Sequence, residues 1–198
     1  MSTPNGLNLP ELLLELEVRV RDQGAPVADL LAPGLPEEQI RSALAAIGLA
    51  APDEVVQWFS WHNGTVRTQP RHEVVLILWR PYSLEEAIQQ WLGRERAIAE
   101  GWWREEWLPI GDYFNADRLA VHCPNPATKL AVVRNVVPEE GGWDEDEVPS
   151  VQSLALVVSW WLDALRRRWV RWDANIGGWD NQGWYDSAPE EQRRTLIL

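Results

Sequence analysis

The sequence predicts an α+β fold: an antiparallel sheet of about four strands flanked by helices, with an N-terminal helical extension and a tryptophan-rich C-terminal tail. Three observations predict this class. Apolar residues recur at helical spacing before residue 65, short β-branched runs occupy parts of residues 72–136, and a helical stripe follows at 151–172. Helices, then a run of strands, then a helix is the order typical of an α+β domain.

Three helices are predicted before residue 65. The first begins after Asn8, a suitable N-cap, and ends at Gly24. Its apolar stripe consists of Leu9, Leu12, Leu13, Leu16 and Val20. Residues 25–36 then form a connection punctuated by proline and glycine.

The second and third helices share one pattern. Each begins at a proline, Pro36 or Pro52, followed by acidic residues that favour the positive end of the helix dipole. Each is followed by a glycine, Gly48 or Gly64, which can take the left-handed conformation that ends a helix. The third helix has a core face made of Val55, Trp58 and Phe59, with His62 a possible fourth member.

The strand candidates follow. The run HEVVLILWR (72–80) shows little alternation and predicts a strand buried on both sides. A helix from Ser83 to about residue 100 opens with a capping box, Ser83 with Glu86. Three short strands are predicted after it, in EWLPIGD (106–112), DRLAVHC (117–123) and KLAVVRNV (129–136). The long helix over 151–172 precedes a turn-rich tail that can end in a short helix.

Composition restricts the class of function. The net charge of −12 argues against general nucleic-acid binding, which needs an excess of Lys and Arg, and favours a basic partner. One cysteine, Cys123, excludes an internal disulfide framework and fits a reducing compartment. The first residues lack a basic n-region, and leucine alternates there with glutamate. We therefore expect a cytoplasmic protein with no membrane contact. With 14 tryptophans, some are expected at the surface, where they can anchor a partner.

The sequence shows no catalytic or metal-binding pattern. The three histidines, His62, His72 and His122, have neither HxxxH spacing nor a CxxC beside them. His62 lies in QWFSWHNGT, where the end of a core helix explains it better than a catalytic base. The segment DANIGGWDNQGW begins like a calcium loop but has Trp184 where a bidentate acid is needed. We therefore expect no enzyme activity, no cofactor and no metal.

Two patterns leave alternatives open. The tetrad Gly-Gly-Trp-Asp occurs at 141–144 and at 177–180, and it predicts either two tight turns that each hold a tryptophan or two exposed aromatic-acidic loops. The run RRRWVRW (166–172) interleaves arginine and tryptophan as single-strand nucleic-acid binders do. Arginines at the carboxyl end of a helix explain that run adequately, because the helix dipole favours cations there.

The order of several segments resembles the SUKH superfamily, also known as the Smi/Knr-type cell-wall-assembly regulator family. The segments are LPEEQI, APDEVVQWFSWHNGT, VVLILW, YSLEEAIQQW, WLPIGDYFNADRLAVHC and SLALVVSWWLDAL. The resemblance implies an antiparallel sheet flanked by helices and a non-enzymatic binding role. In bacteria it implies immunity against a toxin, frequently a nuclease or deaminase, and in fungi a scaffold for cell-wall assembly.

We therefore expect a single SUKH-like domain over residues 1–198. Its core spans about 35–170, with an N-terminal helix and connection at 1–34 and a tail at 171–198. The leading hypothesis is an immunity protein that neutralises a polymorphic toxin with a basic surface, without contacting nucleic acid directly. A cytoplasmic scaffold or regulatory domain is the alternative, and a carbohydrate binder that stacks sugars on indoles is a third.

The partner-binding residues are expected in two places. The first is the acidic segment around the first Gly-Gly-Trp-Asp tetrad: Glu139, Glu140, Trp143, Asp144, Glu145, Asp146 and Glu147. The second is the tail around the other tetrad: Trp179, Asp180, Trp184, Tyr185 and Asp186.

Overall fold

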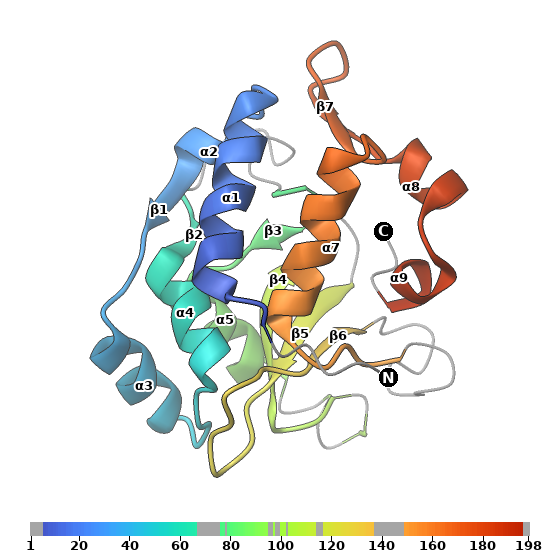
Figure 1. Ribbon diagram of the computed structural model, residues 1–198. Helices are drawn as coiled ribbons and strands as arrows, with labels where there is room; N and C mark the ends of the chain where they lie inside the picture. Colours follow the sequence, from blue (N-terminus) through green and yellow to red (C-terminus); the bar gives the residue numbers. More distant parts are fainter. Residues whose placement is uncertain are drawn as a thin grey trace.

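A four-stranded antiparallel sheet forms the centre of the molecule (Figure 1). The computed structural model describes residues 6–66, 76–77, 79–94, 97, 100–101, 103–113, 117–136 and 149–195, without the side chains of 194 and 195. In spatial order the strands are β3 (Arg80–Pro81), β4 (Trp107–Asp112), β5 (Arg118–His122) and β6 (Val133–Val136). The predicted α+β class and the three short strands after residue 105 are confirmed.

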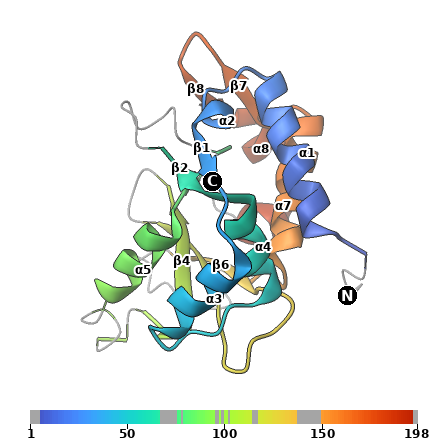
Figure 2. The ribbon, with the colours of Figure 1, turned by 90° about the vertical axis from the view of Figure 1, so that its left-hand side faces the viewer.

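Helices cover the sheet. The five longest are α1 (Leu9–Asp22), α3 (Glu37–Ala45), α4 (Asp53–Trp61), α5 (Leu84–Leu92) and α7 (Leu154–Arg166). Figure 2 shows α1 and α7 together on one side of the sheet. Residues from both helices, from α4 and from the sheet belong to one hydrophobic cluster, which includes Leu16, Phe59, Leu108 and Trp161. A smaller cluster is formed by strand residues that alternate with those of the main cluster, Trp107, Ala120 and Val136, together with Trp103.

The N-terminal helix is part of this core. Leu9, Leu13, Leu16 and Val20 are at most 2% exposed, as the predicted apolar stripe requires. Asn8 occupies the N-cap position, where its carbonyl oxygen accepts the backbone N–H of Leu12 at 3.1 Å. The stripe packs against α7 and α4, so the segment expected as an extension supplies a wall of the core.

The connection at 25–36 contains structure that the sequence analysis missed. A short helix α2 (Val27–Leu30) leads into β1 (Leu31–Pro33), which pairs antiparallel with β2 (His62–Thr65). The prediction that Gly64 ends the third helix is wrong, because α4 ends at Trp61 and Gly64 lies within β2. Gly64 is needed for another reason: it has a φ of +73°, and a β-carbon there would overlap the backbone of Ser83.

The middle of the chain also differs from expectation. Residues 72–75 and 78 of the predicted buried strand lie outside the described residues, while Leu76 and Trp79 form an isolated bridge around a turn. Of the described residues of that run, only Arg80 belongs to β3. The next helix, α5, has the predicted capping box of Ser83 and Glu86 but ends at Leu92 instead of near residue 100, with Gly93 at its C-cap.

The helix predicted over residues 151–172, α7, is shorter than expected. It ends at Arg166, and Arg168 takes a left-handed φ of 57°, which turns the chain out of the helix. Trp172, expected on the helical stripe, lies instead in β7 (Arg171–Asp173), which forms a hairpin with β8 (Gly178–Asp180). The hairpin projects beyond the helices in both ribbon views, and two short helices, α8 (Gln182–Ser187) and α9 (Glu190–Thr195), follow it (Figures 1 and 2).

A buried carboxylate joins α4 to the start of α7. Glu54 is 4% exposed, and its Oε1 accepts the hydroxyl of Ser153 at 2.9 Å and the N–H of Ala155 at 3.2 Å. Its Oε2 accepts the backbone N–H groups of Ala131 at 2.7 Å and Leu154 at 2.9 Å. An acid expected to favour the dipole of its own helix thus neutralises the amino end of another.

Candidate partner-binding surface

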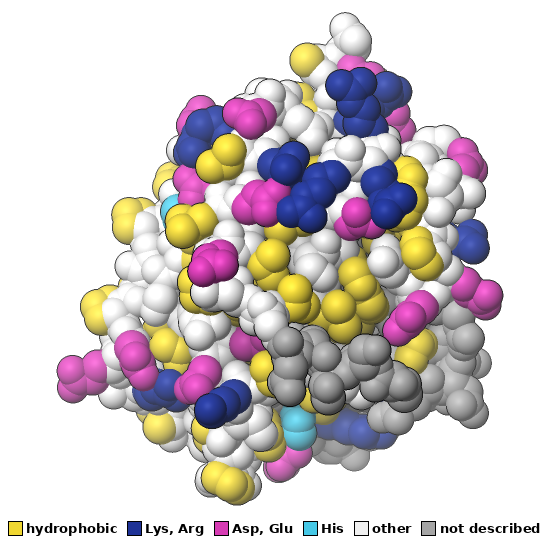
Figure 3. All heavy atoms as spheres, in the orientation of Figure 1, with side chains coloured by type: hydrophobic (Ala, Val, Ile, Leu, Met, Phe, Trp, Pro, Cys, Tyr) yellow, Lys and Arg dark blue, Asp and Glu magenta, His cyan; other side chains and the backbone are white. Residues whose placement is uncertain are grey.

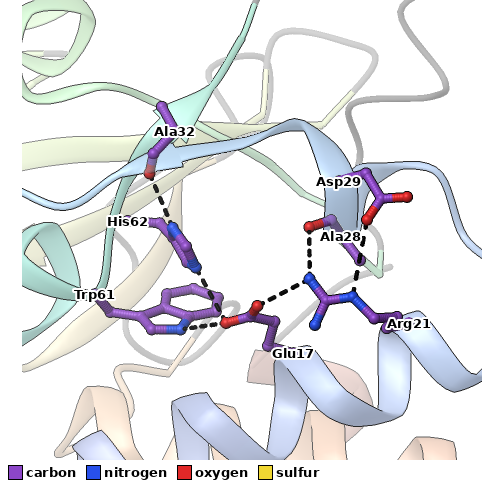
Figure 4. A network of polar contacts seen from close by, with 7 residues as sticks. All are labelled: Glu17, Arg21, Ala28, Asp29, Ala32, Trp61 and His62. Atoms are coloured by element: carbon purple, nitrogen blue, oxygen red, sulfur yellow. Dashed lines mark hydrogen bonds and ion pairs between the residues drawn. The ribbon is translucent and has the colours of Figure 1, made fainter.

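The histidine of QWFSWHNGT belongs to a structural junction (Figure 4). His62 Nδ1 lies 2.8 Å from the carbonyl oxygen of Ala32, and Nε2 lies 3.1 Å from a carboxylate oxygen of Glu17. Glu17 also accepts Trp61 Nε1 at 3.3 Å and Arg21 Nη2 at 3.0 Å. Both ring nitrogens are occupied by contacts between α1, β1 and β2, so the geometry gives His62 a positioning role.

The remaining candidates for nucleophile or metal chemistry are dispersed. Burial raises the pKa of the Cys123 thiol to about 12, so the reactive thiolate is disfavoured. His122 Nε2 contacts Glu106 at 2.9 Å, whereas the neighbouring Cys123 is buried in the main hydrophobic cluster. His72 lies outside the described residues. Within the residues that are described, no group of three or more His, Cys, Asp or Glu side chains could hold a metal ion.

The second Gly-Gly-Trp-Asp tetrad forms the returning side of the β7–β8 hairpin. Gly177 has a φ of 63°, and Trp179 packs edge-to-face on Trp172 with ring centroids 5.7 Å apart. Asp180 accepts Arg171 Nη2 at 2.8 Å and the backbone N–H of Gln182 at 3.2 Å. The backbone N–H of Gln182 and the guanidinium of Arg171 hold the pKa of Asp180 below its ordinary value. The tetrad is therefore the last residue of a tight turn followed by strand β8, with a half-buried tryptophan and an ion-paired acid.

The helix after the hairpin divides its residues between core and surface. Trp184 is 1% exposed and packs edge-to-face on Trp169, with centroids 6.2 Å apart. Its backbone N–H also donates to the carbonyl of Trp169 at 3.0 Å. The expectation that Trp184 lies at a surface is wrong, because this indole holds α8 against the end of α7. Tyr185 is 46% exposed, and Asp186 is exposed beside Gln182.

The tail carries several exposed or half-buried acidic and apolar side chains. We call this group the tail surface and define it as Ile176, Trp179, Tyr185, Asp186 and Glu190. Ile176, at the hairpin tip, is 67% exposed, and Glu190 is exposed in the first turn of α9. Figure 3 shows Asp and Glu side chains on the side of the molecule that carries α8 and α9. Ile176 was missed from the sequence because a lone isoleucine in a turn-rich segment carries no periodic signal.

The first predicted site, residues 139–147, lies outside the described residues. The described chain on either side is anchored at the sheet: β6 ends at Val136, and Val151 pairs antiparallel with Val133 through two hydrogen bonds of 2.8 Å. The role of this acidic segment stays a prediction from the sequence.

Comparison with known proteins adds one match. The model of the SMI1 / KNR4 family (SUKH-1) matches residues 34–148, more than half of the chain, which confirms the resemblance found in the sequence. A comparison with curated proteins found no match. The matched range begins before α3 and ends after β6, so α1, α7 and the tail surface lie outside it. In the described part of the chain, no helix has both the length and the apolar character to cross a membrane.

Proposed function

The chain belongs to the SMI1 / KNR4 family (SUKH-1), and we propose that it is a non-enzymatic, cytoplasmic protein-binding module that neutralises a cognate toxin. Family membership implies protein binding, and the charge of −12 indicates what kind of surface the partner offers. A toxin that acts on nucleic acid needs a basic groove, and an acidic protein is steered to such a groove and covers it.

The acidic character of the chain, combined with an aromatic anchor at the tail, is the observation that carries this proposal. The acidic segment 139–147 supplies six carboxylates and one tryptophan. The tail surface supplies Tyr185, which is 46% exposed, and the exposed carboxylates of Asp186 and Glu190. Aromatic anchors surrounded by complementary charge are typical of interface hot spots.

The experiment co-expresses this protein with the variable C-terminal domain of a large secreted protein encoded by the neighbouring gene. We expect growth to be rescued, and a complex to be recovered whose affinity falls as salt is raised. A scaffold with an endogenous partner would give no rescue, and that result would overturn the proposal.

Two variants locate the interface. Reversing Glu145, Asp146 and Glu147 to lysine should lower affinity by at least about tenfold and weaken its salt dependence. Replacing Tyr185 and Asp186 by alanine should cost a further factor of about five to ten. Glu38→Lys, at an exposed position in α3, controls for the reversal of one charge elsewhere on the surface. If both interface variants bind as tightly as the control, the interface lies elsewhere.

A further inference from the structure

A groove lined by arginine lies where the carboxyl ends of α1 and α7 meet the β7–β8 hairpin. Its volume is about 440 Å³. Four arginines line it, Arg19, Arg166, Arg168 and Arg171, against one acid, Asp22. Figure 3 shows several Lys or Arg side chains, with Asp and Glu side chains among them, near the upper ends of α1 and α7. Three of these arginines are ion-paired with Glu15 or Asp180, so Arg168 is the arginine of the groove whose charge needs a physical explanation.

The groove has more hydrogen-bond donors than its own acids use. Glu15 binds two of the arginines, accepting Arg166 Nη2 at 2.7 Å and Arg19 Nε at 2.6 Å. Within the described part of the chain, the other nitrogens of these two guanidinium groups have no hydrogen-bond partner. Arg171 binds Asp180 through Nε and Nη2. Arg168 has no hydrogen-bond or ion-pair partner for its guanidinium among the described residues. A guanidinium carries five N–H donors and no acceptor, so the surplus suits an anion.

The favourable interaction of a cation with the carboxyl end of a helix does not explain the position of Arg168. Arg166 lies in the last turn of α7, where the helix dipole favours a cation. Arg168 lies beyond the C-cap residue, with a φ of 57° that is unfavourable for any residue with a β-carbon. That backbone conformation directs the chain from α7 into the hairpin and leaves an unpaired cation on the wall of the groove.

The groove also has an apolar wall. Trp172 and Leu165 line it, and Trp172 is fixed in place because its backbone N–H donates to Gln23 Oε1 at 2.8 Å and its ring packs on Trp179. Asp22 adds one acceptor at the rim. Guanidinium donors, an indole face and a single carboxylate together match a peptide, which brings carboxylates, apolar side chains and backbone N–H groups.

We propose that this groove binds an acidic peptide segment of a protein partner, with a carboxylate held by Arg168 and Arg166 and an apolar side chain against Trp172. A nucleic-acid strand is the less suitable ligand, because its many phosphates would be repelled by the rest of an acidic protein. The inference goes beyond toxin neutralisation: the surfaces proposed for the toxin are acidic and take a basic partner, whereas this groove takes the opposite charge.

The test uses the full chain and a fluorescein-labelled pentapeptide, Glu-Asp-Leu-Asp-Glu, followed by fluorescence anisotropy. The variant is Arg168→Asn, because asparagine tolerates the left-handed conformation and the variant should fold. Lys129→Asn, on the exposed loop between β5 and β6, removes the same charge elsewhere. We expect Arg168→Asn to weaken binding at least about fivefold and Lys129→Asn less than about twofold.

Several results would overturn the proposal: no binding of the acidic peptide, equal binding of the neutral peptide Gln-Asn-Leu-Asn-Gln, or equal losses in the two variants. Tighter binding of a single-stranded 20-nucleotide DNA than of the peptide would assign the groove to nucleic acid instead. Thermal melting of both variants checks that they fold. Rescue from the toxin by Arg168→Asn, with peptide binding lost, separates this site from toxin neutralisation; failure of rescue by the unmodified chain leaves the peptide result standing on its own.

Discussion

The carboxylate of Glu17 lies 3.1 Å from Nε2 of His62, so a single pair connects α1 to the first residue of β2. Burial raises the pKa of Glu17, but hydrogen bonds from His62, Arg21 and Trp61 outweigh that effect and hold the pKa below its ordinary value. The sequence places these two residues 45 positions apart, and neither has a periodic pattern that predicts the contact.

We expect Glu17→Gln to destabilise the protein by roughly 1 kcal/mol at pH 7. The pKa of Glu17 is lower in the folded than in the unfolded chain, so its ionised form contributes stability above the unfolded pKa of about 4.3. That contribution is lost as the pH falls through the folded pKa. Urea unfolding between pH 3 and pH 7 measures the difference between the two proteins, which should shrink as the pH falls below about 4.3.

Glu11→Gln serves as the control, because Glu11 is exposed in the first turn of the same helix. A difference between wild type and Glu17→Gln that stayed constant down to pH 3 would show that the ionised carboxylate is not what matters.

Removing the buried carboxylate in Glu54→Ala should cost about 3–5 kcal/mol, because it leaves several buried donors without an acceptor. Glu54→Gln should recover part of that loss, since an amide oxygen still accepts. The free energy of unfolding in urea is the measurement. Glu38→Ala, an exposed acid in the first turn of α3, should change it by less than about 0.5 kcal/mol. Equal effects of the Glu54 and Glu38 variants would contradict the hydrogen-bonding role.

Two glycines have the same backbone conformation, so a comparison of their alanine variants separates the cost of backbone strain from the cost of steric overlap. Gly24 has a φ of +74° with open space around it, whereas Gly64 has a φ of +73° and its added β-carbon would meet the backbone of Tyr82 and Ser83. We expect Gly24→Ala to cost about 1–2 kcal/mol, from strain alone. Gly64→Ala should cost about 3 kcal/mol or more, since backbone cannot move aside easily. Thermal melting measures the loss of stability in both variants. Similar losses would mean that β2 shifts to accommodate the added β-carbon without a further loss of stability.

The thiol of Cys123 should react slowly in the folded protein. It is 1% exposed, and burial raises its pKa to about 12, so thiolate is scarce at neutral pH. Titration with a chromogenic disulfide reagent at pH 8 should show less than about a tenth of the thiol reacting in the time that a urea-unfolded sample needs for completion. Equal rates in both samples would show that the chain around Cys123 opens readily.

Local signals in the sequence predicted local structure well. The capping box of Ser83 and Glu86 needs residues only three positions apart, and both of its hydrogen bonds are present at 3.1 Å. The stripe of α1 and the three short strands likewise follow from spacing within one segment. The class of the fold could therefore be derived before any long-range contact was known.

The ends of elements and the site depended on distant residues. Helical spacing continues through Trp172, but the helix ends at Arg166 because Trp169 packs against Trp184 and Arg168 turns left-handed. Trp184 looked like a surface anchor because sequence cannot show that α8 folds back onto Trp169. The arginine groove cannot be predicted from the sequence for the same reason: Arg19 and Arg171 line one groove only when α1 and the hairpin are both folded in place.

Because α1 packs against α7, the apolar stripe of α1 stays uncovered during part of the synthesis of the chain. The apolar stripe of α1 leaves the ribosome before α7, the helix that covers it, which follows only after residues 23–153 have been synthesised. Until then Leu13 and Leu16 have no α7 to pack against, and hydrophobic surface exposed in this way promotes aggregation of nascent chains. Glutamates lie among the leucines of α1 and keep the uncovered helix charged during this interval. Two of them, Glu15 and Glu17, bind Arg166 and His62 after those residues have been synthesised.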